Sequence, residues 1–175
     1  MDEHHFTGED IETVEVQINP FTAKLVGKPF EPGDNPKVDA QFNVGYCVAN
    51  AAYRRPVLLK HFEPEYITDP GVLDYYRDHV KVIVVPELHE RGHYSSAMTV
   101  TLKDGSKYSA SIDMPPGSVG NELADADFVS RFYDCVAFGE MPCMARRADT
   151  IFDMIQNFEK ITDIYDFIEQ FKGEY

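Results

Sequence analysis

Basic residues are scarce in this chain, and their scarcity argues against two classes of partner. The 175 residues include 16 Lys and Arg against 30 Asp and Glu, a formal net charge of -14 at pH 7. Nucleic acids and anionic membrane surfaces both need a positive footprint on the protein that binds them. We therefore expect neither nucleic acid nor a membrane among the partners.

Long apolar runs and targeting signals are also missing. No run approaches the ~18 apolar residues that a membrane-spanning helix requires. The first residues, MDEHHFTGEDIE, are acidic, whereas signal and transit peptides are basic. The three cysteines, Cys47, Cys135 and Cys143, are odd in number and lack a CxxC spacing, which favours reduced thiols over a disulfide framework. These features predict a soluble, cytoplasmic protein.

Common catalytic motifs are absent, with one apparent exception. Serine nucleophile elbows, phosphate-binding loops and dinucleotide fingerprints do not occur. The exception is HERGH at residues 89–93, a literal HExxH, which binds zinc when a helix places both histidines on one face. Pro86 precedes this stretch and Gly92 lies inside it, so a helix of the required length is disfavoured. We interpret it as a polar hairpin loop and predict no metal site; the alternative is a zinc hydrolase.

The pattern of apolar residues predicts four strands and several helices. The predicted strands cover residues 11–18, 81–85, 96–102 and 107–113, and Asp104-Gly105 joins the last two as a hairpin. The predicted helices cover 36–55, 69–80, a stretch starting at Asp125, 143–158 and 163–171. No regular βαβ alternation occurs, which favours an α+β fold: two layers, a mostly antiparallel four-stranded sheet packed with helices, and C-terminal helices. We expect residues 1–10 to be a disordered or variable leader and 11–175 a single domain.

One stretch differs in charge from the rest of the chain. Residues 21–60 contain six Lys and Arg against three acidic residues. Within this stretch a Gly- and Pro-rich loop with Lys28 and Lys37 leads into a helix, whose first amides carry partial positive charge. Such a combination can receive a carboxylate. The alternative is a charged loop above a buried helix.

Five stretches of the sequence resemble, in order and spacing, the C-terminal domain of the MmgE/PrpD family. They are IETVEVQINP, KLVGKPFEPGDNPKVDAQFNVGYCVANAA, TDPGVLDYYRDHVKVIVVPEL, TVTLKDGSKYSASIDMPPG and LADADFVSRF. The second of these is similar to the start of the long helix in that domain. The resemblance extends over roughly residues 10 to 171.

The resemblance implies a cofactor-independent enzyme acting on small di- or tricarboxylates. Family members include 2-methylcitrate dehydratase, cis-aconitate decarboxylase and iminodisuccinate epimerase, which move a proton near a carboxylate without a metal. Most of their catalytic groups lie on a larger helical N-terminal domain, and a lysine and a histidine lie in a motif just upstream of the strand that corresponds to residues 11–18. We expect no counterparts of these groups in this chain. The matching positions that would face the substrate cleft are Tyr46, Gln41 and Lys28, whereas His89 and His93 fall in a variable loop.

These inferences give a leading expectation and an alternative. The leading expectation is the lid-like C-terminal domain or subunit of an MmgE/PrpD-type lyase (hydro-lyase or decarboxylase) or isomerase. It lacks the helical catalytic domain, is inactive alone, and has that domain and a small carboxylate as partners. Without its partner, such a lid exposes apolar surface and can form a homodimer. The alternative is a stand-alone, non-catalytic binding or interaction module with the lid fold.

Overall fold

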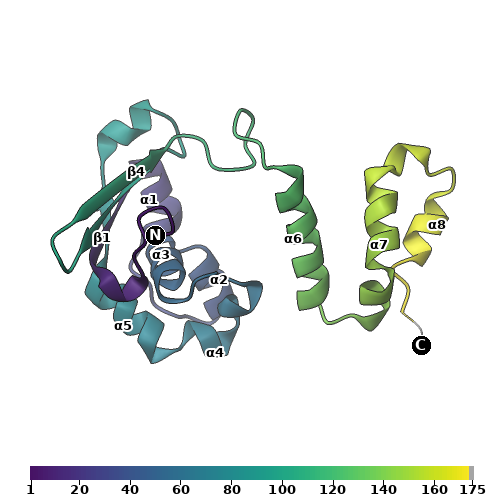
Figure 1. Cartoon of the computed structure of the whole chain (residues 1–175), viewed down its shortest axis with the longest axis horizontal. Coiled ribbons are helices and arrows are strands. Elements are labelled where there is room, and N and C mark those ends of the chain that lie inside the picture. Colours follow the sequence, from purple (N-terminus) through teal and green to yellow (C-terminus); the bar gives the residue numbers. More distant parts are fainter. Residues whose placement is uncertain (174–175) are drawn as a thin grey trace. The chain divides into compact units, whose positions relative to one another are not determined.

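The structure, a computed structural model, describes residues 1–173 and divides the chain into two compact units, Met1–Glu122 and Leu123–Tyr175 (Figure 1). The sequence predicts one domain over 11–175, so this division differs from the expectation. Its local cause is the connecting segment, where Pro115 and Pro116 are followed by two glycines with positive φ, Gly117 and Gly120. Neither strand nor helix continues through such a segment.

The first unit is built on a four-stranded sheet with the strand order β2-β1-β3-β4. The central strand β1 (Ile11–Ile18) pairs in parallel with β2 (Val80–Val84) and antiparallel with β3 (Ser96–Leu102). The hairpin partner of β3 is β4 (Lys107–Ile112), also antiparallel. The mixed, mostly antiparallel sheet confirms the predicted α+β class. The parallel pair was not predicted, because its crossover passes through several short helices instead of one long one.

Helices of the first unit are short (Figure 1). The α-helices are α1 (Pro20–Val26), α2 (Pro36–Gln41), α3 (Val44–Tyr53), α4 (Pro64–Ile67) and α5 (Pro70–His79). The 3-10 helices are η1 (Gly8–Asp10), η2 (Leu59–Phe62) and η3 (Pro86–Glu90). Four of the five α-helices have proline at or near their first position, where its missing N–H costs nothing.

The helix predicted over 36–55 is in fact two helices, α2 and α3, separated at Asn43. The Asn43 carboxamide oxygen accepts a hydrogen bond from the Tyr46 backbone N–H at 2.9 Å, and its nitrogen donates to the Lys28 carbonyl at 2.7 Å. Asn43 is buried, so both bonds are sheltered from water. The side chain replaces backbone bonds that a continuous helix would make, so the helix stops and restarts there.

The hydrophobic core of the first unit lies between one face of the sheet and the helices α3 and α5. This inner face carries, among others, Val14, Val16, Ile18, Val80, Val82, Met98, Val100 and Tyr108. Fully burying an aliphatic side chain, as at Val14, Val16 and Ile18, contributes about 1.5–3 kcal/mol. A Cβ added at Gly45 in α3 would lie 2.7 Å from the Tyr76 ring, so only glycine allows α3 to approach α5 this closely.

Residues 1–10, expected to be a disordered or variable leader, are mostly exposed, but Phe6 and His4 hold them to the core. Phe6 is buried, and its ring stacks on Tyr108 at a centroid distance of 5.4 Å. The His4 ring also stacks on Tyr108, at 4.2 Å. Although most residues of this segment are polar or acidic, Phe6 anchors it to the core. A capping hydrogen bond also orders it: the Thr7 N–H donates to the Asp10 carboxylate at 2.8 Å. These contacts hold the segment against the inner face of the sheet.

The second unit consists of helices alone, as predicted for the C-terminal region. They are α6 (Asp125–Phe138), α7 (Pro142–Gln156), the 3-10 helix η4 (Phe158–Lys160) and α8 (Ile164–Glu169). The Arg147 guanidinium of α7 donates to the Glu169 and Gln170 carbonyls at 3.0 and 3.2 Å, which ties down the end of α8. Over residues 1–173, no helix combines the length and apolarity needed to cross a membrane.

Candidate functional site

Of the residues predicted to face a substrate, Lys28 lies in the loop between α1 and α2, residues 27–35. Gln41 ends α2, and Tyr46 is in α3. Despite its glycines and prolines, this loop is anchored at two points. Phe30 is buried and packs on the Tyr46 ring at 4.4 Å, while its backbone N–H donates to the Tyr76 hydroxyl at 3.0 Å. The second anchor is the bond from Asn43 to the Lys28 carbonyl. The loop therefore presents its exposed side chains from a fixed backbone.

Lys28 and Gln41, two of the three predicted site residues, are exposed at neighbouring positions. Asn43 binds the Lys28 carbonyl and follows Gln41 by two residues, which brings the two segments together. Lys24, also exposed, lies in the last turn of α1. Within the described chain neither Lys24 nor Lys28 forms an ion pair. We call Lys24, Lys28 and Gln41 the cationic site.

Lys37 and the helix N-termini, which the sequence suggested as further anion-binding groups, already have internal partners. The Lys37 ammonium lies 2.5 Å from the Glu63 carboxylate. At the start of α2 the Asn35 side chain accepts from the Val38 N–H at 3.4 Å, and Asn43 caps α3 in the same way. These groups support the structure, so the lysines of the described chain left without an ion pair near the loop are Lys24, at the end of α1, and Lys28.

Tyr46, the third predicted site residue, lies in the core and has no exposed surface. Its ring packs between Phe30 and Phe62, at 4.4 and 6.4 Å. Burial raises the pKa of the Tyr46 hydroxyl, and Arg54 lowers it in part. Arg54 lacks the geometry of a hydrogen bond to it, so this hydroxyl has no partner in the described residues. Tyr46 therefore supports the loop through Phe30, consistent with its place on the apolar stripe of the helix.

Sequence reasoning missed a polar cluster on the same face of α3. Asn50 is fully buried, and Arg54 donates to its carboxamide oxygen at 3.1 Å. The Arg54 guanidinium also binds the Tyr66 carbonyl at 2.8 Å and the Asp69 carboxylate at 2.5 Å. The hydrogen bond from Arg54 lowers the pKa of Asp69. The spacing of Tyr46, Asn50 and Arg54, four residues each, was the signal that could have revealed this cluster.

The HExxH stretch does not form an α-helix. His89 lies in the last turn of the 3-10 helix η3, and His93 lies in the loop that follows. The two imidazole rings lie 5.2 Å apart and nearly perpendicular. The buried Asn19 side chain fixes the loop by donating to the His93 carbonyl at 2.9 Å and the Ser95 carbonyl at 3.3 Å. In the part of the chain that the structure describes, no three His, Cys, Asp or Glu side chains are grouped as metal ligands.

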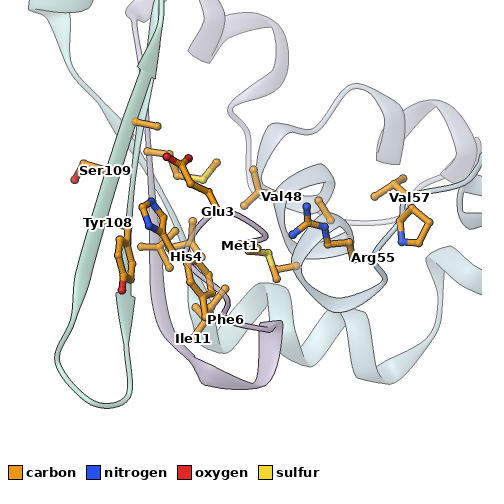
Figure 2. A pocket seen from close by; sticks show the side chains of 17 residues that line it. Met1, Glu3, His4, Phe6, Ile11, Val48, Arg55, Val57, Tyr108 and Ser109 are labelled. Atoms are coloured by element: carbon orange, nitrogen blue, oxygen red, sulfur yellow. The ribbon is translucent and has the colours of Figure 1, made fainter. Parts of the chain in front are cut away.

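A groove of about 620 Å³ lies between α3 and the β3–β4 part of the inner face, beside the first six residues (Figure 2). Its lining is mostly aliphatic and aromatic, and none of the three predicted site residues contributes to it. Of its charged residues, Arg55 forms an ion pair with Asp2. The groove thus offers few polar partners for a di- or tricarboxylate, so the cationic site remains the candidate site.

The fold and these residues define an α+β domain with an exposed lysine, Lys28, on an anchored loop. Residues 1–156 match the MmgE/PrpD C-terminal domain, a range that includes the whole first unit and the helices α6 and α7. The chain therefore belongs to the MmgE/PrpD family, whose members are lyases. This confirms the resemblance seen in the sequence. No curated protein matches the chain.

Proposed function

We propose that this chain is the C-terminal lid domain or subunit of an MmgE/PrpD-type lyase or isomerase for small di- or tricarboxylates, similar to 2-methylcitrate dehydratase. Its partner is a helical catalytic domain or subunit. The observation that carries the proposal is the cationic site: two exposed lysines without ion pairs, beside an exposed amide, in a chain of net charge -14. An acidic protein that keeps Lys28 unpaired on an anchored loop, and Lys24 unpaired in the helix turn before it, is suited to bind an anion there.

The chemistry of this enzyme class gives the cationic site a role. Removing a proton beside a carboxylate builds negative charge, and fixed cations stabilise that charge as it forms. Lys28 would contact a substrate carboxylate as a point charge, and the Gln41 amide would donate a hydrogen bond. The base that removes the proton would come from the helical partner.

The second unit supports the proposed partner. Many of its large apolar side chains are exposed: Phe128, Tyr133, Phe138, Met141, Ile155, Phe158, Ile164, Tyr165, Ile168 and Phe171. Exposed apolar surface of this extent is typical of a face that another protein surface covers. Helices of the catalytic partner are the expected cover.

The proposal is tested by assaying methylcitrate dehydration and cis-aconitate decarboxylation with the pure chain, and again with an added MmgE/PrpD helical domain. We expect no turnover by the chain alone and turnover by the pair. In the pair, Lys28→Ala should lower kcat/KM about tenfold, the loss of ~1.4 kcal/mol of charge stabilisation. Lys60→Ala, which removes another exposed lysine of the basic stretch, is the matched control and should have little effect.

Two results would count against this function. Turnover by the pure chain would show that the catalytic groups lie within it. Carboxylate binding that depends on Lys28, together with no turnover in any pair, would favour the non-catalytic binding module instead.

A further inference from the structure

His61 is the one buried histidine among the six of this chain. It lies in the 3-10 helix η2, where its imidazole Nδ1 accepts a hydrogen bond from the Leu58 backbone N–H at 3.0 Å. A ring nitrogen can accept such a bond only when it carries no proton. The contact therefore assigns the neutral imidazole with its proton on Nε2. Protonation of Nδ1 would leave two N–H groups facing each other.

The surroundings of the ring also favour the neutral form. Burial, followed by the positive charges of Arg54 on α3 and Lys60 on η2, lowers the pKa of His61 from its ordinary value of about 6.5. Two independent features, the acceptor role of Nδ1 and the neighbouring cations, thus act in the same direction.

The other groups around the ring do not offset a positive charge. The Tyr66 ring of α4 packs on the imidazole at a centroid distance of 5.4 Å. The carboxylate of Glu63 is paired with Lys37, and that of Asp69 is paired with Arg54. In the described part of the chain no carboxylate is paired with the imidazole, so its charged form would be a buried cation beside other cations.

The helix η2 is connected through side chains to the loop of the cationic site. Phe62, next to His61, packs on the Tyr46 ring at a centroid distance of 6.4 Å. Tyr46 in turn packs at 4.4 Å on Phe30, which anchors the loop that carries Lys28. The backbone position of Lys28 therefore depends on a row of three aromatic rings that ends at η2.

A second contact links η2 to α2. Glu63, the residue that follows η2, forms its ion pair with Lys37 in the first turn of α2, at 2.5 Å. The last residue of α2 is Gln41. A displacement of η2 would therefore reach Lys28 through the aromatic rings and Gln41 through this ion pair.

We propose that His61 is a proton-sensitive positioning residue for the cationic site. While its imidazole is neutral, it holds η2 closed against α3 and keeps Lys28 and Gln41 in place. When the imidazole takes up a proton, the bond from Leu58 is lost, η2 opens, and the cationic site loosens. That this site binds an anion rests on the proposed function; the opening of η2 does not.

Linkage gives the direction of the effect with pH. In the closed form the pKa of His61 is lowered, whereas in the open form the exposed ring has its ordinary pKa of about 6.5. Below that pH the open form binds more protons than the closed form, so a fall in pH favours opening. The closed form therefore has its full stability above pH ~6.5 and loses stability as the pH falls towards the lowered pKa of the closed form.

The first test measures amide hydrogen exchange in the full chain at pH 7.5 and pH 5.0, corrected for the intrinsic rate at each pH. Protection of the η2 amides and of the Phe30 amide should fall about fivefold or more at the lower pH. In His61→Gln the carboxamide oxygen can accept from the Leu58 N–H at either pH, as in a capping box, so protection should stay equal. His79→Gln is the matched control and should behave like the native chain. The His79 Nδ1 lies 2.9 Å from the Glu12 carbonyl, so it already carries a proton.

Nitrogen NMR of the imidazole in the native chain gives a check that needs no variant to fold. At pH 7.5 the proton should be on the Nε2 of His61, and the ring should titrate with a pKa below that of free histidine. A proton on Nδ1 at pH 7.5 would overturn the proposal. Equal protection of the native chain at both pH values, or the same loss in His61→Gln, would overturn it as well.

Binding of citrate separates this proposal from the proposed function. The native chain and His61→Gln should bind citrate equally at pH 7.5, and the native chain about fivefold more weakly at pH 5.0. Comparing the two proteins at the same pH cancels the protonation of citrate itself. Equal affinities at pH 5.0 would overturn the link between His61 and the cationic site. A pH-dependent protection of η2 without citrate binding at either pH would support the opening of η2 and count against the proposed function.

Discussion

The two units of this chain differ in how well they bury their own apolar residues. The first unit buries side chains from β1, α3, α5 and the leader in one core. The second unit buries only Cys143, Ala148 and Ile151 among its described residues, all on α7. A unit of this size gains little from its own core because most of its surface stays in contact with solvent. The comparison indicates that the first unit is self-sufficient and the second depends on a covering surface.

The largest expected difference between the two units is in their unfolding when each is produced separately. We expect residues 1–122 to unfold in one cooperative transition in urea, and residues 123–175 to show none. Circular dichroism and near-ultraviolet spectra along the titration measure this difference. A sharp unfolding transition in the isolated second unit would contradict this difference, because it would show that three buried residues are enough for that unit to fold alone.

Truncating one buried isoleucine in each unit of the whole chain sharpens the comparison. Ile67 and Ile151 are both fully buried. Ile67→Ala should lower the free energy of the main unfolding transition by about 3 kcal/mol. Ile151→Ala should change it by less than ~0.5 kcal/mol, because the residue belongs to the other unit. Equal losses would mean that the two units unfold together.

The ion pair between Arg54 and Asp69 should give the first unit a pH dependence. The hydrogen bond from Arg54 holds the pKa of Asp69 below its unfolded value of about 3.9. Its contribution to stability is then complete above that value and is lost as pH falls through the folded pKa. The stability difference between the native chain and Asp69→Asn, which keeps an amide able to cap α5, should be full at neutral pH and shrink below pH ~4. A constant difference from neutral to acid pH would contradict this.

The smallest effect concerns two tyrosines in the core of the first unit. The Tyr75 hydroxyl donates to the Gly8 carbonyl at 2.9 Å, and burial raises its pKa to about 12. Tyr75→Phe should cost about 1 kcal/mol. Tyr46→Phe should cost nothing or stabilise slightly, because the Tyr46 hydroxyl has no partner in the described residues. Thermal unfolding of both variants measures the contrast; a loss at Tyr46 equal to that at Tyr75 would indicate a bound water.

Local patterns predicted much of this fold. Alternation over 11–18 gave β1, and Asp104-Gly105 gave the β3–β4 hairpin, because both signals are local. The break at Asn43 escaped prediction, since it depends on a bond to Lys28, which is 15 residues earlier in the chain. The parallel β1–β2 pair escaped prediction because several short helices, and no single long one, connect the two strands.

The candidate site was predicted less well than the fold. Lys28 was suggested by the excess of basic residues over 21–60, and Gln41 by the family resemblance; both are exposed in the structure. Tyr46 was placed in the cleft by resemblance, but its helical spacing already assigned it to the apolar face. Residues 1–10 were expected to be a disordered or variable leader because most of them are polar. The single buried residue Phe6 is enough to hold them against the sheet.

The position of β1 in the middle of the sheet bears on how the chain folds during synthesis. Val14 pairs with Val80 on one side and with Val100 on the other, so β1 leaves the ribosome long before either neighbour exists. Until residue 102 has emerged, this apolar strand has at least one open edge, and contacts that span such long stretches of sequence form slowly. Nascent chains of this protein should therefore be most prone to aggregate, and most in need of chaperones, before β3 is complete.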